Sequence, residues 1–115
     1  MLPYKRSKRV SDVLRKEIAD IIMYKVKDPR IGFVTVTGAD VTDDIKIARV
    51  YVSILKDDER KTTIEVLNSA KSFIRSELSK RVRMKFIPTI EFRLDTSIEY
   101  GSRIEKLLKK IKGER

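Results

Sequence analysis

The sequence predicts a single α+β domain, spanning residues 1–115, in which helices cover a small three-stranded sheet. Three observations support this fold class. The length is that of one ordinary domain, and no linker, repeat or low-complexity tract divides it. Segments with helical spacing of apolar residues alternate with short segments rich in β-branched residues. With 41% hydrophobic residues, the chain can build one core without disulfide bonds or metals.

The first element is expected to be an amphipathic helix over residues 8–25. Its apolar residues recur at helical spacing and form one stripe, which comprises Val10, Val13, Leu14, Ile18, Ile21 and Ile22. Pro29 prevents this helix from continuing, because a proline restricts the preceding residue to extended backbone.

Two strands should follow as an antiparallel hairpin, over residues 32–39 and 46–54. The first is rich in β-branched residues, and residues 40–44 are typical of a turn. In the second strand, alternation places one set of side chains inward and the other outward. The two sets are Ala48, Val50, Val52 and Ile54, and Ile47, Arg49, Tyr51 and Ser53.

A long helix is expected next, with Thr62 and Glu65 as a candidate capping box. Its buried stripe would comprise Leu67, Ala70, Ile74 and Leu78. The small, weakly helical residues at 68–72 predict a bend. A strand over 89–95 then alternates cleanly, and Thr96 and Glu99 would cap a C-terminal helix over about 97–112.

The net charge of +10 is segregated along the chain. Residues 1–30 hold nine Lys and Arg against four Asp and Glu, and residues 67–88 hold six against one. Residues 31–66 are slightly acidic, with five against seven. Charge that serves only solubility is interspersed with the opposite sign. Two basic stretches beside an acidic hairpin therefore indicate a phosphate-binding surface, with a solvated helix face as the simpler alternative.

Missing residue types disfavour several classes of function. The chain has no Cys and no His, which removes disulfides, thiol nucleophiles, imidazole bases and the usual zinc sites. We expect no enzymatic activity, no metal and no cofactor. No apolar run approaches the roughly 20 residues of a membrane span, and no secretory signal is recognisable. We expect a cytoplasmic monomer that binds no membrane, and the absence of Gln with abundant Lys and Glu suggests a thermophilic source.

The stretch Val-Lys-Asp-Pro-Arg-Ile-Gly-Phe-Val-Thr-Val at 26–36 resembles the signature of the ribosome-binding factor A family. Further blocks agree in order and spacing, at 6–10, 48–53, 70–78, 87–88 with 91–92, and 95–101. The resemblance implies a type II KH-like fold, in which a helix-kink-helix replaces the usual Gly-x-x-Gly loop. It also implies a bacterial factor that binds the small (30S) ribosomal subunit and its 16S rRNA late in maturation, with an assembly GTPase as a partner in release.

The kink carries one departure from the family pattern. Members usually have Ala-x-Gly there, whereas this chain has Ala70, Lys71 and Ser72. Serine lacks the freedom of glycine at positive φ. We therefore expect a bend that is milder or displaced by a residue.

The candidate RNA-binding residues come mainly from the two basic stretches. Arginine can form two hydrogen bonds with one phosphate, whereas lysine acts as a point charge. Changing Arg75 or Arg81 to Glu should weaken binding and leave the fold intact. The full set is Arg6, Lys8, Arg9, Arg30, Lys71, Arg75, Lys80, Arg81, Arg83 and Lys85. For Arg30 the alternative is that it holds its own loop by pairing with Asp28.

Other interpretations remain open from the sequence. Aromatic residues stack on bases in some RNA-binding sheets, which is one interpretation of Phe33 and Tyr51. Packing of both residues in the core or sheet is favoured. The acidic turns at 40–44 and 57–59 suggest a magnesium site of a metal-dependent ribonuclease, although Asp is common at turns and helix starts for local reasons. Net charge alone would also suit a non-specific nucleic-acid-binding or membrane-surface protein.

Overall fold

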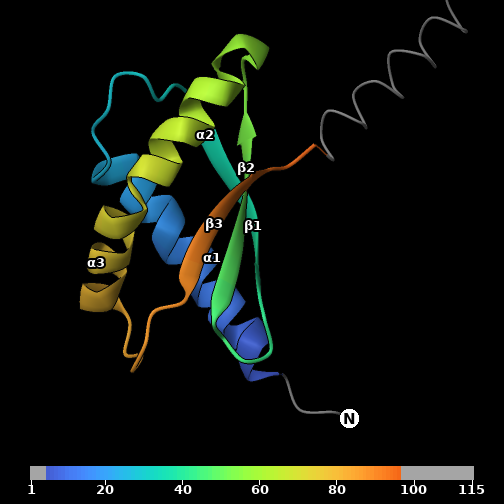
Figure 1. Cartoon of the computed structure of the whole chain (residues 1–115), viewed down its shortest axis with the longest axis vertical. Coiled ribbons are helices and arrows are strands. Elements are labelled where there is room, and N and C mark those ends of the chain that lie inside the picture. Colours follow the sequence, from blue (N-terminus) through green and yellow to red (C-terminus); the bar gives the residue numbers. More distant parts are fainter. Residues whose placement is uncertain (1–4, 97–115) are drawn as a thin grey trace, which may run out of the picture.

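A computed structural model describes residues 5–96, in which three α-helices pack on a three-stranded sheet (Figure 1). The predicted α+β class is confirmed. The predicted C-terminal helix at about 97–112 lies outside the described residues, as does Glu99 of the capping box expected with Thr96. In chain order the elements are α1 (Arg6–Tyr24), β1 (Val34–Val41), β2 (Ile47–Ile54), a 3-10 turn η1 (Asp57–Glu59), α2 (Arg60–Ser69), α3 (Lys71–Arg81) and β3 (Thr89–Leu94).

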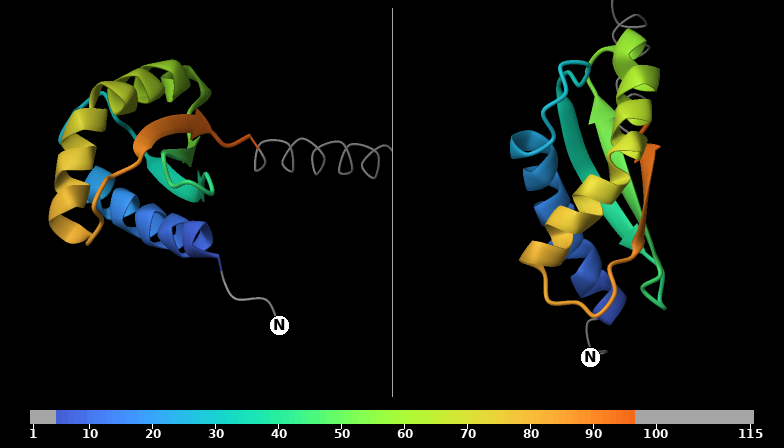
Figure 2. Two further views of the ribbon diagram at one scale, coloured as in Figure 1. Left: turned by 60° about the horizontal axis from the view of Figure 1, so that its bottom comes forward. Right: turned by 60° about the vertical axis from the view of Figure 1, so that its left-hand side comes forward.

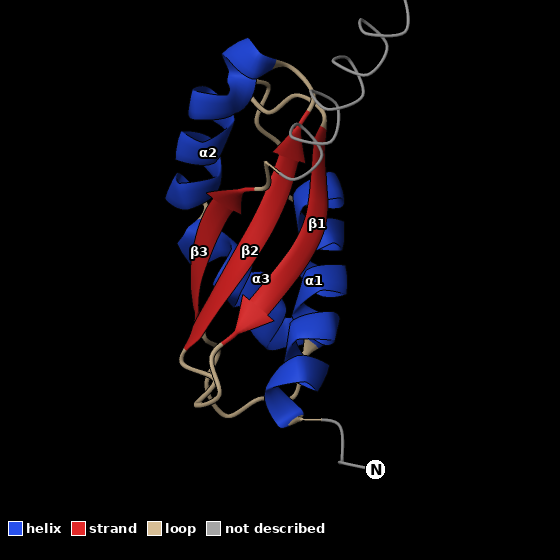
Figure 3. Ribbon diagram, turned by 90° about the vertical axis from the view of Figure 1, so that its right-hand side faces the viewer, coloured by secondary structure: helices blue, strands red, loops and turns tan. Residues whose placement is uncertain are grey.

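The sheet has the strand order β1-β2-β3. The predicted hairpin is confirmed, since β1 and β2 pair antiparallel, while β2 and β3 pair parallel. A parallel pair needs a long crossover connection, and α2 and α3 provide it. Figure 3 shows the three helices behind the sheet, so all of them cover the same face. In the described part of the chain, no helix is long and apolar enough to span a membrane.

Strand β1 begins and ends two residues later than predicted. The pairing with β2 shifts between Val36 and Gly38, as in a β-bulge. The extra residue shifts the alternation of side chains, so that the Val41 side chain points into the core. Val41 is 6% exposed and belongs to the strand, whereas the sequence placed it in the turn. The hairpin turn follows it, with Ile45 in the left-handed region at φ 59°.

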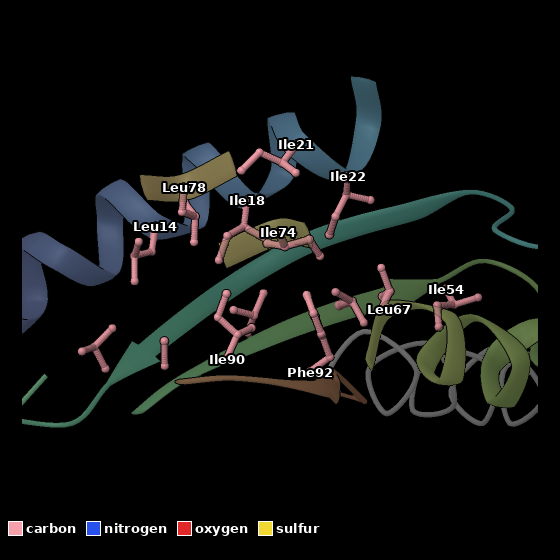
Figure 4. Close-up of a cluster of buried hydrophobic side chains, with 14 residues drawn as sticks. Leu14, Ile18, Ile21, Ile22, Ile54, Leu67, Ile74, Leu78, Ile90 and Phe92 are labelled. Atoms are coloured by element: carbon pink, nitrogen blue, oxygen red, sulfur yellow. The ribbon is translucent and has the colours of Figure 1, made fainter. Parts of the chain in front are cut away.

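The core lies between the helices and the sheet (Figure 4). The inward set predicted for β2 is entirely buried, as are Ile90 and Phe92 of β3. Two details of α1 differ from the predicted stripe. Val13 is 48% exposed, whereas Ser11 is 4% exposed. Phe33, expected to pack in the core or sheet, is 73% exposed; Tyr51 is half-buried on the outer face of the sheet.

The predicted capping box at Thr62 is wrong. Helix α2 already begins at Arg60, and no side chain caps its first turn. The preceding 3-10 turn makes a cap unnecessary, because the Arg60 N–H donates to the carbonyl of Asp57 and starts the helix. Arg60 Nη2 also pairs with the Asp57 carboxylate at 2.7 Å.

The predicted bend separates α2 from α3 at Ala70, which has φ −90° and ψ 3°. The Ala70 N–H donates to the carbonyls of Val66 and Leu67, and its own carbonyl accepts from Ile74 N. Both helices therefore keep their hydrogen bonds across the bend. Figure 2 shows the change of direction, which lets α2 lie along the sheet and α3 reach α1.

Candidate nucleic-acid interface

A groove of about 390 Å³ lies where the first half of α1 faces the end of α3 and the loop after it. We call it the arginine groove. Four arginines line it, from the two basic stretches that are far apart in the sequence. Its other described lining residues are mainly apolar, with a single acid. The lining residues are Arg6, Arg9, Val10, Val13, Leu14, Glu17, Arg81, Val82, Arg83 and Met84.

Arg81 is held by acidic residues of α1. Its Nη1 donates to Asp20 Oδ2 at 2.5 Å and to Glu17 Oε2 at 3.3 Å. The hydrogen bond with Asp20 is the main reason that the pKa of Arg81 is raised. The guanidinium therefore joins α3 to α1, and only 23% of the Arg81 side chain is exposed to solvent.

The other three arginines of the groove are exposed. Within residues 5–96, no ion pair or side-chain hydrogen bond engages Arg6, Arg9 or Arg83. Their positive charges can therefore meet an external anion without breaking an internal pair. Apolar side chains also line the groove, and apolar surroundings strengthen such electrostatic contacts.

Arg30 lies at the other end of α1 and pairs with Asp28. Its Nε and Nη2 donate to the two carboxylate oxygens at 3.0 and 2.7 Å, and its backbone N–H donates to Oδ1 at 2.9 Å. The side-chain hydrogen bonds from Arg30 are the largest cause lowering the pKa of Asp28 to about 2. The pair holds the Asp-Pro-Arg turn closed. The geometry of Arg30 therefore matches the alternative from the sequence, in which Arg30 holds its own loop by pairing with Asp28.

Lys71 of the kink lies away from the arginine groove. Lys71 is half-buried and lines a hollow of about 560 Å³ with Asn68 and residues of β3, including Arg93. Ser72 is exposed to solvent and belongs to helix α3, so the bend does not need a positive φ at this position. Lys71 and the arginine groove are therefore not parts of one cavity.

The remaining candidates are exposed and have intramolecular contacts. Arg75 Nη2 donates to the Ile87 carbonyl at 2.8 Å, which ties the loop before β3 to α3. Lys8 pairs with Asp12 at 3.7 Å and Lys80 with Glu77 at 3.4 Å. Lys85 Nζ lies 5.6 Å from the centroid of the Phe86 ring. Surface pairs of this kind contribute about 0–1 kcal/mol and break easily.

A second groove of about 320 Å³ contains residues that the sequence interpretation passed over. It lies between the loop after α1 and the junction of α2 and α3. Phe73, 43% exposed, lines it with Lys25 and Lys27. Helical spacing in the sequence could have indicated that Phe73 is exposed. Phe73 directly precedes the buried Ile74, so it falls beside the core stripe of the helix rather than in it.

The acidic turns have local partners. Asp44 accepts hydrogen bonds from the Thr42 hydroxyl at 2.6 Å and from Lys46 N at 3.1 Å, and the first of these is the main cause of its lowered pKa. Asp57 pairs with Arg60. Within residues 5–96, no group of three or more acidic side chains is placed to hold a metal ion.

Comparisons with known proteins agree on one family. The family model described as ribosome-binding factor A matches residues 6–108. Ribosome-binding factor A of Thermodesulfovibrio yellowstonii is 53% identical over 97% of this chain and 95% of its own length.

Solved structures agree with this assignment. The crystal structure of ribosome-binding factor A from Thermus thermophilus has a TM-score of 0.69 at 25% identity, covering 76% of this chain and 94% of that one. A Thermus thermophilus homology model, fitted into the cryo-EM map of a 30S–RbfA complex, has a TM-score of 0.64 at 27% identity, covering 75% and 91%. The chain therefore belongs to the ribosome-binding factor A family.

Proposed function

We propose that this protein binds the small ribosomal subunit and its 16S rRNA during late maturation and rRNA processing, and that it acts by binding RNA without catalysis. The arginine groove is the observation that carries the proposal. Arg6, Arg9 and Arg83 meet there without an ion-pair partner among the described residues. Guanidinium groups match the geometry of phosphates. The related Thermus model fitted to a 30S complex supports the same partner.

Binding alone can perform this function if the protein prefers one state of the RNA. A factor shifts an equilibrium only by its difference in affinity for the two states, and a tenfold preference corresponds to about 1.4 kcal/mol. The protein would favour an rRNA conformation that permits processing and would then leave. The family resemblance suggests that an assembly GTPase assists this release.

Salt dependence gives a quantitative test of the arginine groove. Each phosphate contact lowers the logarithm of the binding constant by about 0.7–0.9 per logarithm of salt concentration. Three contacts predict a slope of about −2 to −3, or roughly a 20- to 40-fold weaker affinity between 50 and 200 mM salt. A slope near zero would contradict phosphate binding.

A charge-reversal experiment tests the location. We expect Arg9→Glu and Arg83→Glu to reduce sedimentation of the protein with small subunits at moderate salt. Lys61→Glu is the matched control, since Lys61 is exposed in the first turn of α2 and does not line the groove. Figure 1 shows the start of α2 and the end of α3 at opposite ends of the fold. Equal loss for all three variants would attribute binding to net charge alone.

Arg81→Glu is unsuitable for this test. The sequence suggested that this variant leaves the fold intact. In the structure the new carboxylate would face Glu17 and Asp20, so it would also loosen α1 from α3. Arg75→Glu would lose the bond to the Ile87 carbonyl.

The rival functions have less support. A metal-dependent ribonuclease would need Asp43 and Asp44, but Asp44 already serves the hairpin turn. Cleavage of precursor rRNA in magnesium by the wild type, lost in an Asp43→Asn, Asp44→Asn variant, would favour it. Equal competition for bound subunits by duplex DNA or anionic vesicles would favour a non-specific binder.

A further inference from the structure

The groove beside the helix kink has the chemistry of a base-stacking site. Phe73 presents a ring that is 43% exposed, whereas the adjacent Ile74 is 0% exposed and fills the core. The ring lines the groove together with the buried side chain of Val66 and the half-buried Val26. Planar bases stack on an exposed aromatic face of this kind, whatever their sequence.

The rim of the groove is positively charged. Lys25 and Lys27 are exposed, and neither has an ion-pair partner among residues 5–96. Asp28, the only acid among the described residues of the lining, is neutralised by Arg30 through two side-chain hydrogen bonds. The two lysines therefore remain able to attract phosphates, and no unpaired carboxylate of the lining repels them.

We propose that Phe73 stacks on a base of single-stranded RNA while Lys25 and Lys27 contact the flanking phosphates. Such a segment combines the two features that the groove complements, an unpaired aromatic base and a negative backbone. This inference rests on the proposed RNA binding and adds a second contact, separate from the arginine groove. Duplex RNA does not fit the site, because its bases are stacked on one another.

The proposal predicts a selective loss of affinity. In the full-length protein, Phe73→Leu keeps an apolar side chain in the groove but removes the aromatic face. We expect it to bind a mixed-sequence single-stranded RNA decamer about tenfold more weakly, since one base–aromatic stack contributes on this scale. Binding of a duplex RNA of equal length should not change. Phe33→Leu is the matched control, because Phe33 is 73% exposed and does not line the groove.

A fluorescent base provides a direct readout. With 2-aminopurine at one position of the decamer, stacking should quench the emission on binding to wild-type protein and to Phe33→Leu, but much less with Phe73→Leu. Thermal unfolding by circular dichroism checks that each variant is folded. Should Phe73→Leu prove unfolded, Lys25→Ala with Lys27→Ala provides the second test, with an expected loss of affinity for the single strand.

The outcomes separate this proposal from the proposed function. Wild-type affinity and quenching in Phe73→Leu would overturn the stacking site, even where Arg9→Glu and Arg83→Glu still abolish subunit binding. Failure of the wild type to bind small subunits would instead overturn the proposed function. Equal binding of an acidic peptide, lost in the same Phe73 variant, would assign the groove to a protein partner and also overturn the proposal.

Discussion

Removal of the Ser11 hydroxyl tests the junction between α1 and the end of β1. The Ser11 Oγ donates to the Ser7 carbonyl at 2.8 Å and accepts from Val41 N at 3.1 Å. Among residues 5–96, strand β1 has one neighbour in the sheet, which is β2. Alternate N–H groups of such an edge strand point away from that neighbour, and Val41 is only 6% exposed. Ser11→Ala would therefore leave a buried N–H without a partner.

The expected cost follows from two opposing terms. An unsatisfied buried donor costs about 1–3 kcal/mol, while alanine in place of serine in a helix gains roughly 0.5 kcal/mol. The variant should lose about 0.5–2.5 kcal/mol of unfolding free energy. Each kcal/mol corresponds to about 4–8 °C in the melting temperature of a domain of this size.

Urea unfolding, followed by circular dichroism, measures this loss. Ser76→Ala is the matched control, because Ser76 is exposed within α3 and should report only the gain in helix propensity. Hydrogen exchange of the Val41 amide adds a local measurement, and the exchange should accelerate in Ser11→Ala. A Ser11→Ala variant as stable as Ser76→Ala, with unchanged Val41 exchange, would refute the role assigned to the hydroxyl.

Three further predictions concern the loop, the helix junction and the kink. The pKa of Asp28, lowered to about 2 from 3.8 by Arg30, should appear in a carbon-13 carboxyl titration and return toward 3.8 in Arg30→Ala. Because the folded-state pKa is depressed, the stability from this pair should be complete at neutral pH and be lost as the pH falls from 3.8 through about 2. Arg81→Ala should lower the urea midpoint, whereas Arg83→Ala should not, since Arg81 pairs with Glu17 and Asp20 of α1 and Arg83 has no ion pair within residues 5–96; equal midpoints would contradict the role of Arg81 as an anchor. Ser72→Gly should destabilise the protein by about 0.5 kcal/mol in urea unfolding, because Ser72 is helical and offers glycine no positive φ to adopt. A more stable glycine variant would show that the kink geometry differs.

The limits of the sequence interpretation are clearest where a side chain has a partner on a distant element. Periodicity placed Val13 in the core stripe of α1 and omitted Ser11, yet Val13 is 48% exposed and Ser11 is 4% exposed. Phe33 was expected to pack and is exposed. Hydrophobicity reports the average preference of a residue, whereas burial depends on which element lies opposite.

The candidate interface illustrates the same division. Charge counting identified two basic stretches, but could not show that Arg81 would bind Glu17 and Asp20 while Arg83 remained exposed. The separation of Lys71 from the arginine groove likewise depends on which side of α3 faces α1. The groove around Phe73 needs the loop after α1 to lie against the kink.

The sequence by itself determined the class of fold, the antiparallel hairpin, the inward face of β2 and the family. These features depend on short-range periodicity, turn residues and local motifs, which the chain carries whatever its long-range contacts. Only the tertiary structure decided the parallel pairing of β2 with β3, the ion pairs of Arg81 and the position of the two grooves. Those features arise from the docking of elements distant in sequence, and the packing of the whole core sets that geometry.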